Sequence, residues 1–182
     1  MMIVKIIVVV VAMISLALVV AMFTKKKYTL IREITIRQSP QEVFDYLKLL
    51  KHQKSYSKWL SLDPDTRIGI KGQPDGTPGA ILTFESKDSK AGKGEWEITG
   101  LLEGKKVDFE LRFLAPYQFT ANGYFAMQPV AADQTKLVWV YNSGMNWPKN
   151  FMLLLLDMDK IIGKDIEESL SRVKQNLEMQ PN

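Results

Sequence analysis

The feature that most constrains this chain is a long uncharged apolar stretch near its N-terminus. Residues Ile6 to Phe23 contain no charged side chain and are almost entirely aliphatic. A helix of about 20 apolar residues is long enough to cross the hydrocarbon core of a bilayer. Lys5 lies near one end, where its long side chain can reach the headgroups. The pattern therefore predicts a transmembrane anchor over residues 1–24, a basic juxtamembrane linker over residues 25–27 and one globular domain over residues 28–180.

Two other interpretations of this stretch fit its length and composition less well. A cleaved secretory signal also has a basic start and an apolar run, but that run is usually only about 7–15 residues long. Bulky Met22 and Phe23 also stand where a cleavage site needs small residues. A buried core helix would need a polar face for solvent, and this stretch is apolar on every side. An uncleaved single-pass anchor is therefore favoured over a signal peptide.

The charges beside the anchor indicate its orientation. Lys25, Lys26 and Lys27 follow the apolar run directly, whereas Lys5 and the terminal amine precede it. Basic residues next to a membrane span tend to remain in the cytoplasm. We expect a membrane protein whose domain is cytoplasmic, and the exported side of the membrane is the alternative.

The remaining charge excludes one class of partner. The chain has a formal net charge of +4, but removing Lys5 and the three juxtamembrane lysines leaves 20 basic and 20 acidic residues. A domain that binds nucleic acid usually carries a net basic charge. Nucleic acid is therefore not expected as a partner. The chain also has no cysteine, which excludes disulfides, thiolate nucleophiles and cysteine metal sites.

The first part of the domain predicts a strand followed by short helices. Apolar and polar residues alternate from Leu30 to Arg37, as in a half-buried strand. Ser39-Pro40-Gln41-Glu42 has the composition of a capping box with proline in the first turn. A second short helix is expected between Lys48 and Trp59. The Gly- and Pro-rich segment of residues 72–79 predicts a turn.

The middle of the domain predicts a series of strands joined by short turns, which indicates an antiparallel meander. The expected strands are Thr66 to Ile70, Ala80 to Ser86, Gly92 to Leu102, Val107 to Phe113, Phe119 to Gln128 and Lys136 to Tyr141.

The end of the domain predicts one long helix. Apolar residues recur at three- and four-residue spacing from Phe151 to Leu177, and Pro148 stands where a helix begins. Since each strand has one apolar face and only this helix is long enough to cover it, we expect an α+β fold. About seven antiparallel strands would curve around the C-terminal helix, with one transmembrane helix before them.

Three stretches carry a resemblance to a known superfamily. They are the opening strand leading into Ser39 to Phe44, the turn Asp75 to Ala80 (DGTPGA), and the segment Met158 to Lys174. With the order of elements, they resemble the START-like, helix-grip (SRPBCC) superfamily, specifically the polyketide cyclase/dehydrase and lipid-transport family. The resemblance spans Tyr28 to about Glu178. It implies an apolar pocket between sheet and helix that holds a lipid, isoprenoid or polyketide-like molecule.

The titratable residues form no recognisable catalytic set, and no metal or cofactor is expected. The single histidine, His52, stands among lysines and is expected at the surface. Asp165 and Glu168 could share a helix face, although nearby basic residues favour a salt-bridged surface. Glu95 and Glu97 flank Trp96 in a strand, so they are expected to face water. Residues 72–79 lack the Gly-Lys-Ser/Thr ending of a phosphate loop.

Aromatic and flexible apolar side chains remain as candidates for the pocket lining, although such stripes are more often plain core. The pocket candidates are Trp59, Phe84, Trp96, Phe109, Phe113, Phe125, Trp139, Tyr141, Met145, Leu155, Met158 and Ile162. A basic pocket rim that could meet anionic headgroups is expected at Lys48, Lys51, Lys54 and Lys58.

The expected function is a membrane-anchored module that binds a hydrophobic small molecule. A cyclase- or dehydratase-type enzyme acting on a hydrophobic substrate is the first alternative. A scaffold or stress-response protein without a ligand is the second.

Overall fold

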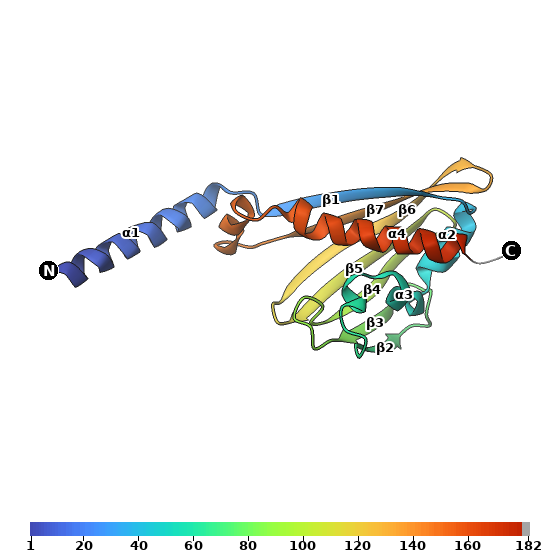
Figure 1. Cartoon of the computed structure of the whole chain (residues 1–182), viewed down its shortest axis with the longest axis horizontal. Coiled ribbons are helices and arrows are strands. Elements are labelled where there is room, and N and C mark those ends of the chain that lie inside the picture. Colours follow the sequence, from blue (N-terminus) through green and yellow to red (C-terminus); the bar gives the residue numbers. More distant parts are fainter. Residues whose placement is uncertain (180–182) are drawn as a thin grey trace.

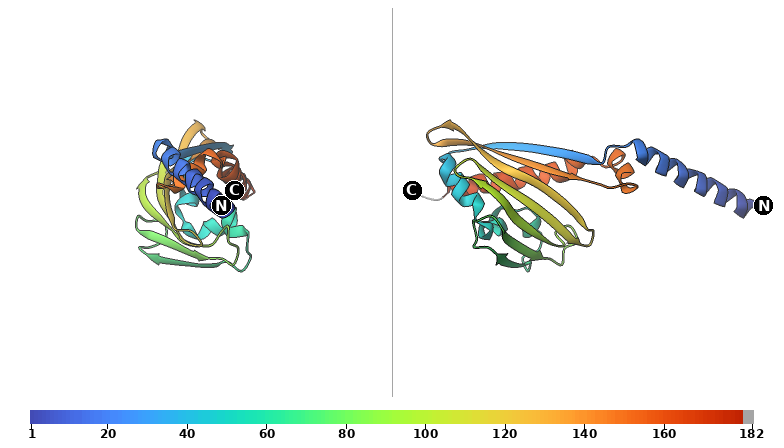
Figure 2. Two further views of the ribbon diagram at one scale, coloured as in Figure 1. Left: turned by 90° about the vertical axis from the view of Figure 1, so that its left-hand side faces the viewer. Right: turned by 180° about the vertical axis from the view of Figure 1, so that it is seen from behind.

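The computed structural model describes residues 1–179, so residue 180, the predicted end of the domain, lies just outside this range. The first element is helix α1 (Met2–Phe23), which is almost entirely exposed and extends away from the rest of the molecule (Figure 1). It is long and apolar enough to cross a membrane. The view from behind shows the same separation of α1 from the remaining elements (Figure 2).

The domain is built on one antiparallel sheet with the strand order β1-β7-β6-β5-β4-β3-β2. Only β1 is out of sequence order, because it pairs with the last strand. The predicted meander is therefore confirmed. The strands are β1 (Lys27–Ile36), β2 (Arg67–Gly72), β3 (Ala80–Glu85), β4 (Lys93–Leu102), β5 (Lys106–Ala115), β6 (Phe119–Ala131) and β7 (Gln134–Gly144).

Short helices follow β1 at the end of the sheet distant from α1 (Figure 1). Helix α2 (Pro40–Lys48) begins with the predicted capping box, in which the side chains of Ser39 and Glu42 each bind a backbone N–H of the other residue. The predicted second short helix is wrong as one element. The structure has three separate turns there, namely η1 (Leu50–His52), α3 (Gln53–Tyr56) and η2 (Trp59–Ser61).

Helix α4 (Lys164–Glu178) lies along the concave face of the sheet. Its buried face presents Ile166, Leu170 and Val173 to the core. The Arg32 guanidinium of β1 bonds the side chain of Glu167 in the first turn of α4 and the side chain of Asp159 in the turn before it, which fixes the start of the helix to the sheet. The order and arrangement of these elements confirm the helix-grip prediction.

The C-terminal helix is shorter than the sequence pattern predicted. The expected helix of about 30 residues from Pro148 is replaced by the 3₁₀ turn η3 (Lys149–Leu154), the π-helical turn η4 (Asp159–Gly163) and then α4. Asp157 supplies a physical reason for the break, since its carboxylate accepts a hydrogen bond from the Lys160 N–H at 3.2 Å. Such a bond is typical of a residue that starts a new helix.

The register of the sheet defines two ends of the domain. Lys27 pairs with Gly144, Phe113 with Phe119 and Glu85 with Lys93. These positions therefore lie at one end, which is the end next to α1. We call it the α1 end of the sheet.

Candidate functional site

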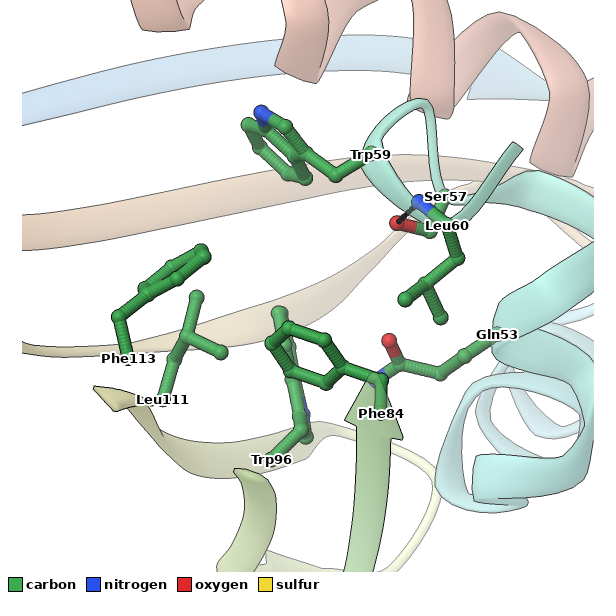
Figure 3. A pocket seen from close by; sticks show the side chains of 8 residues that line it. All are labelled: Gln53, Ser57, Trp59, Leu60, Phe84, Trp96, Leu111 and Phe113. Carbon is green, nitrogen blue, oxygen red and sulfur yellow. Dashed lines mark hydrogen bonds between the residues drawn. The ribbon is translucent and has the colours of Figure 1, made fainter. Parts of the chain in front are cut away.

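A small apolar cavity lies between β3–β5 and the short helices (Figure 3). Its volume is about 20 Å³, which is room for roughly one water molecule. Eight residues line this interior cavity: Gln53, Ser57, Trp59, Leu60, Phe84, Trp96, Leu111 and Phe113. In the observed conformation, no lipid-sized molecule fits there.

The rest of the interior is filled by aromatic rings. Trp96 stacks on Phe109 with a centroid separation of 4.2 Å, and Phe125 packs edge-on against Trp139 at 4.6 Å. All four are nearly fully buried. This stack occupies the space between sheet and helix in which the resemblance implied a pocket.

The absence of a side chain at Gly94 makes room for the ring of Phe84, which lines the cavity. A side chain at Gly94 would meet the Phe84 ring at 2.5 Å. Without one, Phe84 lies across β4 and reaches Phe113, whose ring centroid is 5.7 Å away. Phe113 in turn stacks on Phe119 at 4.4 Å. Since Phe119 is exposed, these rings form a continuous path from the cavity to the surface at the α1 end.

The side-chain amide of Gln53 points into the cavity, which Ser57 also lines (Figure 3). Gln53 is only 2% exposed. Two hydrogen bonds join the short turns here, from the Leu60 N–H to the Ser57 hydroxyl and from the Ser57 N–H to the Gln53 carbonyl, and neither involves the side-chain amide of Gln53. A buried amide gains free energy when a ligand or a water supplies a hydrogen bond.

Further buried polar atoms lie near the aromatic stack. Within residues 1–179, the Tyr56 hydroxyl and the Trp139 Nε1 have no hydrogen-bond partner. Burial raises the pKa of Tyr56 and of Tyr141 well above the usual phenol value. Both phenols therefore stay protonated at neutral pH and can donate hydrogen bonds.

Charged side chains are absent from the buried part of residues 1–179. The buried polar residues there are Gln53, Ser57, Thr66, Thr135, Ser143, Asn150 and Ser169. Acid–base catalysis needs a titratable group positioned at the reacting atoms. Residues 1–179 as a whole contain no cluster of three histidine or acidic side chains that could hold a metal.

The predicted pocket candidates separate into three groups. Trp59, Phe84, Trp96 and Phe113 line the cavity. The second group is buried in the core around it and comprises Phe109, Phe125, Trp139 and Tyr141. The third group follows β7: Met145 and Met158 are half-buried, Ile162 packs partly against the core and Leu155 is 76% exposed.

The cavity contains four residues that the sequence reasoning missed: Gln53, Ser57, Leu60 and Leu111. Leu111 could have been found, because it alternates in phase with Phe109 and Phe113. Gln53 stands between charged and polar residues and gives no such signal.

The four predicted rim lysines do not gather at the α1 end. Lys48 pairs with Asp45 on α2, and the Lys54 ammonium donates to the Pro64 carbonyl at 3.3 Å. Lys58 pairs with Glu168 of α4 at 3.0 Å. Lys51 is exposed and lies in η1. This placement does not favour contact of the four with the membrane that α1 could span.

The remaining titratable candidates have structural partners. His52 is half-buried rather than freely solvated; it stacks on Tyr46 at 4.5 Å, and its Nδ1 lies 2.9 Å from the Tyr46 carbonyl. Glu95 and Glu97 face away from the interior, as predicted, and both bind Arg112. Glu168 forms the expected salt bridges rather than a carboxylate pair with Asp165.

Comparison with known proteins supports the fold. No family model matches the sequence, and no curated protein sequence matches it significantly. Among solved structures, the Zhui aromatase/cyclase from Streptomyces sp. R1128 aligns with a TM-score of 0.61 at 13% identity, covering 84% of this chain and 94% of that one.

Two further structures align over similar lengths. The Aha1 dimer from Colwellia psychrerythraea gives a TM-score of 0.56 at 18% identity, covering 85% of this chain and 99% of that one. Ara h 8.0201 gives 0.55 at 13% identity, with the same coverages of 85% and 99%. At these identities the likeness concerns architecture, and the chain therefore has the START-like helix-grip fold of the polyketide cyclase-like proteins.

Proposed function

We propose that this protein is a membrane-anchored module that binds a hydrophobic small molecule between the sheet and α4. The observation that carries the proposal is the apolar, aromatic-lined cavity into which the Gln53 amide points. Sites for small molecules are mostly apolar, with a few polar groups that orient the ligand. The ligand class is an apolar molecule with one hydroxyl or carbonyl group for this amide.

Binding a molecule larger than water requires the cavity to open. The two elements able to move are the ring of Phe113 at the α1 end and the turn η2, which carries Trp59 and Leu60. Trp59 and Phe113 are only partly buried, whereas the stack behind them is fully buried. Opening at this side exposes less apolar surface than separating the stack would.

Helix α1 supports the anchoring part of the proposal. It is 22 residues long and, unlike a core helix, almost none of it is buried in the domain. Lys25 to Lys27 favour a cytoplasmic domain. Because the chain has no cysteine, a single Val130→Cys label tests the side. A membrane-impermeant maleimide should react only after the cells are opened, and reaction with intact cells would place the domain outside.

The alternative that the protein is an enzyme is less well supported than ligand binding, because of the kinds of polar side chain that are buried. Three structures with the same fold are aromatase/cyclases by name. The buried phenols here are neutral donors, however, and the buried polar side chains of residues 1–179 include no carboxylate or imidazole to move a proton. The arrangement suits orientation of a ligand better than acid–base chemistry.

Native mass spectrometry of the full chain tests ligand binding. Lipid around α1 would also be retained, so the measurement compares wild type with Leu60→Trp, which fills the interior cavity. We expect wild type to retain one apolar molecule per chain that the variant loses. A variant with the same melting temperature and the same bound molecules would contradict the proposal. Asn122→Trp, at an exposed position of β6, controls for adding a large ring.

A further inference from the structure

The segment between β7 and η4 turns large apolar side chains outward. In residues 147–155, which we call the η3 segment, Leu154 is 62% exposed and Leu155 is 76% exposed. Trp147 and Met152 are exposed as well. Isolated exposed apolar residues are ordinary, but a contiguous group of them marks an interaction surface.

The η3 segment is held against the end of α1. The buried Asn150 amide donates to the carbonyls of Ala21 and Thr24 at 2.7 and 3.0 Å. The Trp147 indole N–H lies 3.4 Å from the Leu18 carbonyl. Carbonyls at the end of a helix lack intrahelical partners, and Asn150 supplies a donor to two carbonyls at this end of α1. Figure 1 shows η3 beside this end of the helix.

These contacts fix the depth of the η3 segment along α1. Leu18 precedes the end of α1 at Phe23 by five residues, which corresponds to about 8 Å of helix at 1.5 Å per residue. If α1 spans a bilayer, the η3 segment therefore lies level with the last turns of the span. Interfacial segments insert their apolar faces to about 5–10 Å.

The surface between the two elements is almost entirely apolar. An open groove there is lined by five apolar side chains and by Thr24 and Lys25. The apolar residues are Val19, Val20, Phe23, Leu153 and Leu154. A groove that continues from the span of α1 onto the η3 segment matches the acyl chains that surround such a span.

Charge and backbone bonding also suit this location. Residues 145–156 contain one charged side chain, Lys149, and the three lysines of residues 25–27 stand next to the same helix end. Basic residues at this depth attract anionic headgroups, and tryptophan is enriched at the interface. The N–H groups of Leu155 and Leu156 both bond the Met152 carbonyl, at 2.9 and 2.8 Å, which limits the cost of burying them in lipid.

We propose that the η3 segment is a second membrane contact, lying in the interface of an anionic bilayer beside the exit of α1. This inference rests on the anchoring in the proposed function. It adds an orientation, because two contacts hold the α1 end of the sheet toward the lipid. The exposed Phe119 and the cavity behind it then face the source of an apolar ligand.

Single-cysteine labelling of the full chain tests the inference. A polarity-sensitive fluorophore is placed by Leu154→Cys or Leu155→Cys, and the chain is put into nanodiscs of phosphatidylcholine and phosphatidylserine. Some of the lipids carry a nitroxide quencher near the headgroup or at mid-chain. We expect blue-shifted emission at both positions and several-fold stronger quenching by the headgroup-proximal nitroxide than by the mid-chain one.

Two control positions separate the possible failures. A Val11→Cys label reports on α1, and a Val130→Cys label reports on the exposed hairpin at the far end of the domain. Quenching at Val11 without quenching at Leu154 and Leu155 would overturn the inference while keeping the anchor. A blue shift without lipid quenching would show that protein covers the segment, such as a second copy, and would also overturn it. No quenching at Val11 would refute the anchor and the inference together.

Discussion

The aromatic stack under the sheet and the η3 segment are both strongly apolar, but their surroundings are opposite. Trp139 is 1% exposed and packs against Trp96, Phe109 and Phe125. Leu155 is 76% exposed and has polar solvent around it unless another phase covers it. The stack supplies its own apolar environment, and the η3 segment needs one from outside the chain. Apolar composition alone therefore does not distinguish a core segment from a membrane-facing one. The distinction depends on whether neighbouring elements of the chain cover the apolar side chains.

The largest expected effect is a difference in the free energy of unfolding between two alanine substitutions, one in each region. Trp139→Ala removes a ring from a filled interior and should lower the free energy of unfolding by about 3–5 kcal/mol. Leu155→Ala should change it by less than about 0.5 kcal/mol, as at an exposed position. Chemical denaturation of the full chain in detergent, followed by circular dichroism, measures both. An equally large loss at Leu155 would show that the η3 segment belongs to a packed core.

A smaller effect is expected at the connection between the two regions. Asn150→Ala leaves the carbonyls of Ala21 and Thr24 without their donor, which should cost about 1–3 kcal/mol. It should also loosen α1 from the domain. Spin labels at Val11→Cys and Val130→Cys should then give a broader distance distribution in nanodiscs.

Thr24→Val is the matched control for this prediction. It removes the hydroxyl bond to the Val20 carbonyl at the same end of α1 but keeps the amide of Asn150 in place. An unchanged distance distribution in Asn150→Ala would show that this amide does not orient the domain.

A third prediction concerns the interior as a ligand site. Phe113→Ala should enlarge the cavity at its α1 end and raise the affinity for an apolar fluorescent probe by about tenfold, equivalent to about 1.4 kcal/mol. Leu114→Ala changes the next, exposed position of the same strand and serves as control. Titration of both variants with the probe measures the difference. Equal affinities would mean that the probe binds elsewhere, for example at α1.

The sequence predicted the sheet well because one face of each strand is apolar and the other polar. The alternation of Val107 to Phe113 became β5, and the Ser39–Glu42 capping box formed as predicted. The prediction of one long helix from Pro148 was wrong. Apolar residues at three- and four-residue spacing occur both in a helix that packs on a core and in separate turns whose apolar side chains face outward. Neither Asp157 as a helix start nor Asn150 as a partner of α1 is visible in that pattern.

The candidate site was predicted only in part. The inner-face aromatics were identified by parity, but whether they leave a cavity depends on how their rings interlock. Trp96 and Phe109 stack closely enough to fill the centre. Gln53 was missed because its burial comes from the packing of short turns, which no local periodicity encodes.

The smallest predicted effect is a pH dependence of access to the interior. The Lys58 ammonium, and then Arg172, hold the pKa of the Glu168 carboxyl below its usual value of 4.5. A depressed folded-state pKa means that the carboxylate stabilises the folded protein above the unfolded pKa, and that this stabilisation is lost as pH falls through the folded value. Lys58 immediately precedes η2, so protonation of Glu168 weakens one contact between this turn and α4. The bonds from the Lys58 N–H to the Ser169 hydroxyl and from Arg172 to the Ser61 hydroxyl remain, which keeps the expected effect small.

An apolar probe should therefore dissociate faster from wild type at a pH well below 4.5 than near pH 7. Glu168→Gln should show the faster rate already at neutral pH and a flatter profile below it. Asp165→Asn keeps the Lys58–Glu168 pair and should follow wild type. Stopped-flow displacement of the probe gives these rates, and a wild-type-like profile in Glu168→Gln would show that access does not pass η2. Access would then have to occur at Phe113 and Phe119, on the side of the domain that the η3 segment holds against the lipid.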